Sequence, residues 1–93
     1  SITGKSIESM VNDLPNIQEL NLTGCPHLIE NNGSIYLTQL KYLRTLDVTR
    51  NGLASEDFDT LATSLSLTRV HWFENERVDP VRKGRLVAAI AFN

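Results

Sequence analysis

The chain has 93 residues, of which 41% are hydrophobic and 22% are charged, and its formal net charge at pH 7 is −2. This length fits one domain with a small core, and the composition excludes a disordered, collagenous or membrane-spanning chain. The slightly acidic balance offers no electrostatic footprint for nucleic acid, and no apolar run reaches the roughly 20 residues of a membrane helix. We therefore expect neither a nucleic-acid nor a membrane partner.

The first predicted unit is a helix followed by a short strand. The apolar face of the helix comprises Ile7, Met10, Val11 and Leu14. Pro15 ends this helix because it biases the preceding residue away from helical geometry. The segment Ile17-Gln-Glu-Leu20-Asn-Leu22-Thr-Gly-Cys25 then alternates apolar and polar residues, which predicts a strand with one buried and one open face.

The second unit repeats this order. A short helix is predicted around Ile35, Leu37 and Leu40, although polar residues interrupt it. The segment Leu43-Arg-Thr-Leu46-Asp-Val48-Thr-Arg-Asn51 matches the first strand position by position. An interval of 26 residues separates Leu20 from Leu46, and the other matched positions keep it. Such self-similarity at a fixed period predicts stacked repeats.

The third unit begins with Ser55-Glu-Asp, an acidic first turn that suits a helix N-terminus. One helical face comprises Phe58, Leu61, Ala62 and Leu65. The strand Leu67-Thr-Arg-Val70-His-Trp72-Phe-Glu-Asn75 follows at an interval of 24 residues. Trp72 takes the register of Leu22 and Val48, which predicts a core position.

A last helix is predicted from Asp79-Pro80, an N-cap followed by proline at the first helical position, to Phe92. It is expected to close the final unit with five apolar side chains and to leave Arg82, Lys83 and Arg85 exposed. The five are Val81, Leu86, Val87, Ile90 and Phe92.

Cys25, Asn51 and Asn75 fall where the chain leaves each strand. An amide side chain there can satisfy backbone groups that no strand pairs, and cysteine can fill the place as a small, weakly polar group. The next buried contact after each turn is expected from Leu28, Leu53 and Val78.

The three segments, each of the form LxxLxLxx(N/C), resemble the leucine-rich-repeat family over roughly residues 7–78. The resemblance implies an α/β fold: a right-handed solenoid with three short parallel strands, helices on the convex side and a C-terminal capping helix. We expect one domain over residues 1–93, with repeats at roughly 1–28, 29–53 and 54–78, a cap at 79–93, and a longer parent protein. The cysteine-containing copy is similar to repeats of F-box substrate receptors.

In this family the open strand face usually forms a concave surface that receives a partner. The resemblance therefore implies a protein–protein interaction module or scaffold that binds another protein, without enzymatic activity, cofactor, metal or small-molecule substrate. The candidate partner-binding residues are Glu19, Asn21, Thr45, Asp47, Arg69, His71 and Phe73. Phe73 and the neighbouring Arg69 are the predicted anchors, although the terminal helix or a loop could instead cover Phe73.

Two other roles stay open. The repeats could cap or space a longer array without binding a ligand, or they could belong to the substrate receptor of an F-box-type ubiquitin ligase. With Cys25 as its only cysteine, the chain forms no internal disulfide, and we expect an intracellular, cytoplasmic location. The sequons at Asn21 and Asn32 would matter only after secretion.

Several chemical motifs are weak. The segment Thr3-Gly-Lys-Ser6 lacks the first glycine of a phosphate-binding loop. Cys25, His27, His71 and Glu74 are metal-capable residues, but Cys25 is assigned to the buried ladder and the two histidines lie two repeats apart, which argues against a metal site. Asp47 and His71 fall on adjacent strands and are expected to lie within hydrogen-bonding reach, but no serine or cysteine joins them on that face.

Overall fold

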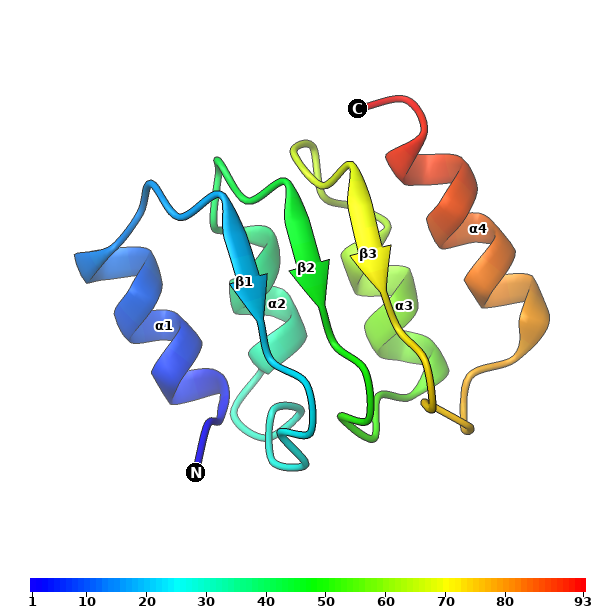
Figure 1. Ribbon diagram of the computed structural model, residues 1–93, viewed down its shortest axis with the longest axis horizontal. Coiled ribbons are helices and arrows are strands. Elements are labelled where there is room, and N and C mark those ends of the chain that lie inside the picture. Colours follow the sequence, from blue (N-terminus) through cyan, green and yellow to red (C-terminus); the bar gives the residue numbers. More distant parts are fainter.

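The computed structural model describes residues 1–93 and shows an α/β chain in which four helices alternate with three strands (Figure 1). In chain order the elements are α1 (Gly4–Asp13), β1 (Glu19–Asn21), α2 (Gly33–Thr38), β2 (Thr45–Asp47), α3 (Ser55–Leu61), β3 (Arg69–His71) and α4 (Pro80–Ile90). The strands form one open sheet in the order β1-β2-β3, with α2 and α3 behind it and α1 and α4 at its two ends. The longest helix has 11 residues, and none is long and apolar enough to cross a bilayer.

The three strands are parallel and pair in the register that the repeat predicted. Leu20 lies opposite Leu46, and Leu46 lies opposite Val70. The pairing continues past the strand ends, because the Leu22 N–H donates to the Asp47 carbonyl at 2.8 Å. Leu46 is fully buried, whereas Leu20, on a strand with only one neighbour, is partly exposed. The prediction of three short parallel strands is confirmed.

The core lies between the sheet and the helices. Leu22 and Val48, directly after β1 and β2, are buried in it together with Phe58 of α3, which is fully buried. Trp72 packs against this core, with its ring edge-on to Phe58 at a centroid distance of 5.7 Å. The predicted core position of Trp72 is therefore confirmed. Leu28, Leu53 and Val78, the predicted contacts after each turn, are also buried.

Asn75 joins two successive turns. Its Nδ2 donates to the carbonyl oxygens of Val48 and Trp72 at 2.8 and 2.9 Å. Its Oδ1 accepts from the backbone N–H groups of Asn51 and Leu53 at 3.2 and 3.0 Å. The side chain is almost completely buried, so four backbone groups that would otherwise lack a partner are satisfied by one amide.

Asn51 forms only two such hydrogen bonds with backbone groups, compared with four for Asn75. Its Nδ2 donates to the carbonyl oxygens of Leu22 and Cys25 at 2.6 and 3.0 Å, but its buried Oδ1 has no partner. The turn from Cys25 to Leu28 is one residue longer than the turn from Asn51 to Leu53, and it contains Pro26, which has no N–H. There the Cys25 N–H donates to the Leu22 carbonyl and the Leu28 N–H to the Cys25 carbonyl, so neither reaches Asn51.

The residues directly before Cys25, Asn51 and Asn75 adopt the left-handed backbone conformation. Gly24, Arg50 and Glu74 have φ values of 72°, 54° and 59°. Glycine adopts this conformation without cost, whereas the other two side chains oppose it. Arg50 and Glu74 form an ion pair at 2.9 Å across neighbouring turns, and both side chains are mostly exposed. The same backbone bend is therefore built in all three units from different residues.

Leu65 does not join the helical face on which it was predicted. The helix α3 ends at Leu61, and Leu65 is 92% exposed. The Ser64 hydroxyl accepts from the N–H groups of Ser66 and Leu67 at 3.2 and 3.1 Å. These bonds turn the chain toward β3 before another helical turn can form, so the prediction for Leu65 is wrong.

The helix α4 closes the stack less completely than predicted. Leu86 is buried and Ile90 packs against the core, but Val81, Val87 and Phe92 are exposed. The prediction of a five-residue apolar cap is therefore wrong for three of its members. The reason is that α4 packs beside α3, as Figure 1 shows, and leaves one of its own faces open.

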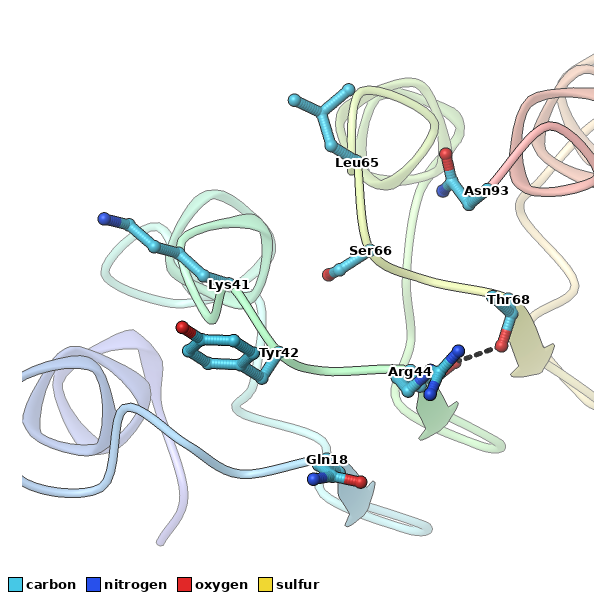
Figure 2. Close-up of a pocket in the computed structure, with 8 residues that line it drawn as sticks. All are labelled: Gln18, Lys41, Tyr42, Arg44, Leu65, Ser66, Thr68 and Asn93. Atoms are coloured by element: carbon cyan, nitrogen blue, oxygen red, sulfur yellow. Dashed lines mark hydrogen bonds between the residues drawn. The ribbon is translucent and has the colours of Figure 1, made fainter.

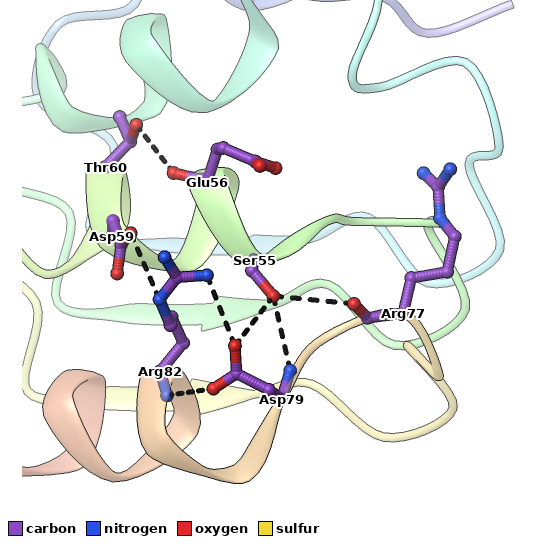
Figure 3. Close-up of polar contacts among 7 residues, drawn as sticks. All are labelled: Ser55, Glu56, Asp59, Thr60, Arg77, Asp79 and Arg82. Carbon is purple, nitrogen blue, oxygen red and sulfur yellow. Dashed lines mark hydrogen bonds and ion pairs between the residues drawn. The ribbon is translucent and has the colours of Figure 1, made fainter.

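Polar contacts fix the start of α4 on α3 (Figure 3). Arg82 forms ion pairs with Asp59 of α3 at 3.6 Å and with Asp79 at 3.2 Å, so it is half-buried rather than exposed as predicted. Ser55 lies within 3.4 Å of both the Asp79 carboxylate and the Arg77 carbonyl. The Arg82 backbone N–H, helped by Ser55 and by the Arg82 charge, holds the pKa of Asp79 below its usual value.

The two asparagines should differ in their contribution to stability. Because Asn75 satisfies four backbone groups and Asn51 only two, Asn75→Ala should lower the free energy of unfolding by about 3 kcal/mol or more, and Asn51→Ala by about half as much. Urea unfolding of the two variants measures the difference. An equal or larger loss for Asn51→Ala would contradict this account of the turns.

Substitution by alanine should change the stability of the chain in opposite directions at Gly33 and Gly84. A Cβ on Gly33 would lie 1.8 Å from the Leu28 carbonyl oxygen, whereas nothing lies within 4 Å of one on Gly84. Gly84→Ala should therefore stabilise the chain by about 1 kcal/mol through helix propensity. Gly33→Ala should displace the start of α2 and lower the melting temperature. A neutral Gly33→Ala would show that α2 does not approach this carbonyl.

Candidate functional site

All seven predicted contact residues lie on one face of the sheet. The register sets Glu19, Thr45 and Arg69 in one row, and Asn21, Asp47 and His71 in the next. The intervening positions Leu20, Leu46 and Val70 point to the opposite, core side. Thr23, Thr49 and Phe73 continue the face beyond the strand ends, where the Arg50 N–H still donates to the Phe73 carbonyl at 3.0 Å. We use the term strand face for the outward residues Glu19, Asn21, Thr23, Thr45, Asp47, Thr49, Arg69, His71 and Phe73.

Phe73 is open to solvent. The structure leaves 66% of its surface exposed, so neither α4 nor a loop covers it. Its ring stacks on the ring of His71, with centroids 6.4 Å apart and an interplanar angle of 30°. Arg69 and His71 of β3 and Phe73 just beyond its end thus present a cation and two aromatic rings on the same face. The acidic residues Glu19 and Asp47 lie on the two other strands.

Asp47 is held in place at the centre of the strand face. Its Oδ1 accepts from the Thr49 N–H at 2.9 Å, and Asn21 makes the same bond with Thr23 on the neighbouring strand. Desolvation by the flanking strands acts to raise the pKa of Asp47. The Thr49 and Thr23 hydrogen bonds and the charge of His71 outweigh it, so the net pKa lies below its usual value.

The expected hydrogen bond between Asp47 and His71 is not formed, although the two residues are register partners. A hollow of about 410 Å³ lies over this part of the face and is lined by Asp47, His71 and residues of β1 and β2. It offers carboxylate and amide oxygens, an imidazole and a hydroxyl to a bound group. The arrangement can therefore form hydrogen bonds and ion pairs with a ligand.

The other motifs are accounted for by local structure. Thr3 and Ser6 form a capping box at the start of α1: the Thr3 hydroxyl accepts from the Lys5 N–H, and the Ser6 hydroxyl accepts from the Thr3 N–H. No group of three or more histidine, cysteine or acidic side chains is placed to hold a metal ion. His27 contacts Glu30 at 3.3 Å, and Cys25 is half-buried.

The sequence analysis missed a polar groove where the strands begin. Gln18, Arg44 and Thr68 hold the same position in the three units, directly before each strand, and all three are exposed. Strict alternation would turn these side chains away from the strand face, because the next residue points outward. Instead, the N–H groups of Arg44 and Thr45 both donate to the Gln18 carbonyl, at 2.8 and 3.1 Å, and neither of these successive residues is buried. The charge on Arg44 was the one available signal.

Comparisons of the chain with models of protein families, with curated proteins and with solved structures found no match.

The lowered pKa of Asp47 predicts a pH dependence of stability. The carboxylate contributes stability above the unfolded pKa of about 3.9, and this contribution is lost as the pH falls through the lower folded value. Asp47→Asn keeps an oxygen for the Thr49 N–H but cannot titrate. Between about pH 5 and about pH 3, wild type should therefore lose more stability than this variant in urea unfolding. Parallel curves for the two proteins would contradict the prediction.

Proposed function

We propose that the chain is a leucine-rich-repeat module, a right-handed solenoid with its helices on the convex side. Three features support this proposal: the repeated LxxLxLxx(N/C) segments, the pairing of equivalent positions in adjacent strands, and the buried amide side chains at the turns. A short strand cannot bury its apolar face alone, so stacking of such units is what stabilises them.

We further propose that the module binds another protein through the concave strand face. The observation that carries this is Phe73, an aromatic ring that is 66% exposed on an otherwise polar face. Aromatic and arginine side chains supply most of the binding energy in protein interfaces, and Arg69 at the start of β3 lies on the same face as Phe73. A partner with an acidic group beside an apolar side chain would suit β3, and one with donors would suit Asp47 and Glu19.

The same geometry favours recognition over catalysis. Asp47 and His71 supply a carboxylate and a potential base, but no serine or cysteine lies on the strand face to act as a nucleophile.

The single cysteine suits an intracellular, cytoplasmic setting, where disulfides rarely form.

A second candidate role is that of a spacer within a longer array. It is favoured by the apolar side chains left open on α4, namely Val81 at 61% and Val87 at 49% exposure. A further unit stacked there would bury them. In this role the strand face would have no ligand of its own.

A paired substitution tests the binding role. Arg69→Ala with Phe73→Ala should weaken the complex with a purified partner by about 2 kcal/mol or more, roughly 30-fold in Kd, while the circular dichroism spectrum stays unchanged. The partner is first sought by affinity capture and then titrated by calorimetry. The matched control, Lys5→Ala with Ile35→Ala, removes one cation and one exposed apolar side chain from the helical side.

The outcomes separate the two roles. Loss of affinity in the strand-face variant alone supports recognition through this face. Equal affinity in wild type and in both variants contradicts it. Loss of affinity on Arg85→Ala with Val87→Ala, which alters α4, would favour the array role instead.

A further inference from the structure

A second surface lies at the end of the sheet where the strands begin (Figure 2). Two hollows of about 260 and 430 Å³ adjoin there and share Gln18, Arg44 and Thr68. We call the combined hollow the strand-entry groove. Because these three residues precede successive strands that pair through the Arg44 and Thr68 N–H groups, the groove runs across all three units.

The groove gathers cations that have no ionic partner. Lys41, Arg44 and Arg69 line it, and none of them forms an ion pair. Lys5, Arg77, Lys83 and Arg85 elsewhere are also without an ion pair, but only in this groove do three such cations line adjoining hollows. Glu19 is the only acidic side chain in its wall. A chain with a net charge of −2 thus concentrates uncompensated positive charge at one edge.

This concentration has an energetic consequence. Arg44 directly precedes β2 and Arg69 begins β3; the Arg69 N–H donates to the Arg44 carbonyl at 3.0 Å, and both side chains border the same hollow. Like charges so placed repel each other, and an anion between them would replace repulsion by attraction. Arginine also matches the two oxygens of a carboxylate with its planar pair of donors.

The outer rim of the groove is apolar. Tyr42 and Leu65 are 57% and 92% exposed, and both belong to the loops that lead into β2 and β3. Figure 2 shows the Tyr42 ring beside the Lys41 side chain on one side of the groove, with Leu65 above them, and Arg44 and Thr68 together on the other side. A ligand that lies across the groove meets Arg44 on one side and Lys41 with the apolar surface of Tyr42 and Leu65 on the other.

We propose that the strand-entry groove binds an extended acidic peptide segment. Its carboxylates meet the guanidinium of Arg44 and the ammonium of Lys41, and an apolar side chain of the segment rests against Tyr42 and Leu65. A peptide fits better than a free phosphate because the groove spans three strands, about 10 Å, and carries an apolar rim. The Gln18 amide also lines the groove and can bond peptide backbone groups. The Thr68 hydroxyl donates to the Arg44 carbonyl at 3.2 Å and the Ser66 hydroxyl to the Leu40 carbonyl at 3.5 Å, so these two hydroxyls can serve only as acceptors for peptide N–H groups.

The test uses residues that belong to the groove alone, because Arg69 is shared with the strand face. The probe is an acetylated, amidated hexapeptide of alternating glutamate and leucine, titrated into the isotopically labelled 93-residue chain and followed by NMR. The same peptide with glutamine, and inorganic phosphate, are titrated in parallel. Lys41→Gln with Arg44→Gln is compared with wild type and with the control Lys83→Gln plus Arg85→Gln on α4.

We expect saturable shifts of the Arg44, Ser66 and Thr68 amides with the glutamate peptide and at least about tenfold weaker binding of the glutamine peptide. The groove variant should lose about the same factor, and the α4 control should bind as wild type does. No saturable binding, equal binding of the glutamine peptide, full affinity in the groove variant, or tighter binding of phosphate than of peptide would each overturn the proposal. None of these results depends on whether the strand face binds a partner.

Discussion

The buried amide of Asn75 is the interaction on which the arrangement of the units depends. The chain must bend sharply after each strand, and the bend leaves backbone donors and acceptors that no strand can pair. Asn75 satisfies such groups in its own turn and in the preceding one, so it fixes the distance and the rotation between units. Once two turns are locked in this way, the strands before them must pair in register, and hydrophobic burial behind the sheet follows.

Because the strands pair in register, the outward side chains at equivalent positions of the three units lie in rows across the sheet. Neighbouring strands lie about 4.8 Å apart, so the side chains of Thr45 and Arg69, or of Asp47 and His71, stand next to each other although 24 residues separate them in the chain. The framework residues are interchangeable among units, whereas the outward residues are not. A strip with Arg69 and Phe73, and an acidic area around Asp47, can therefore coexist on one small sheet without altering the fold.

Much of the architecture could be predicted because it repeats. The positions of Leu20, Leu46 and Val70 gave the register, and matching Trp72 to Leu22 and Val48 placed it correctly at the core. Structural features that occur in only one unit could not be predicted from the repeat. The turn made by Ser64 exposes Leu65, and the ion pairs of Arg82 draw α4 to the side of α3. The strand-face residues followed from alternation, whereas the strand-entry groove did not, because alternation fails at Arg44, where the N–H groups of Arg44 and Thr45 share the Gln18 carbonyl.

The central claim, that the three units are stacked in register with buried amides between them, is tested most directly by NMR in solution. Close contacts should appear between the backbone protons of Leu20 and Leu46 and of Leu46 and Val70, and the side-chain amide protons of Asn51 and Asn75 should exchange slowly with solvent. Contacts displaced by even one residue, or rapid exchange of both amides, would contradict the stacking and remove the basis for the strand face.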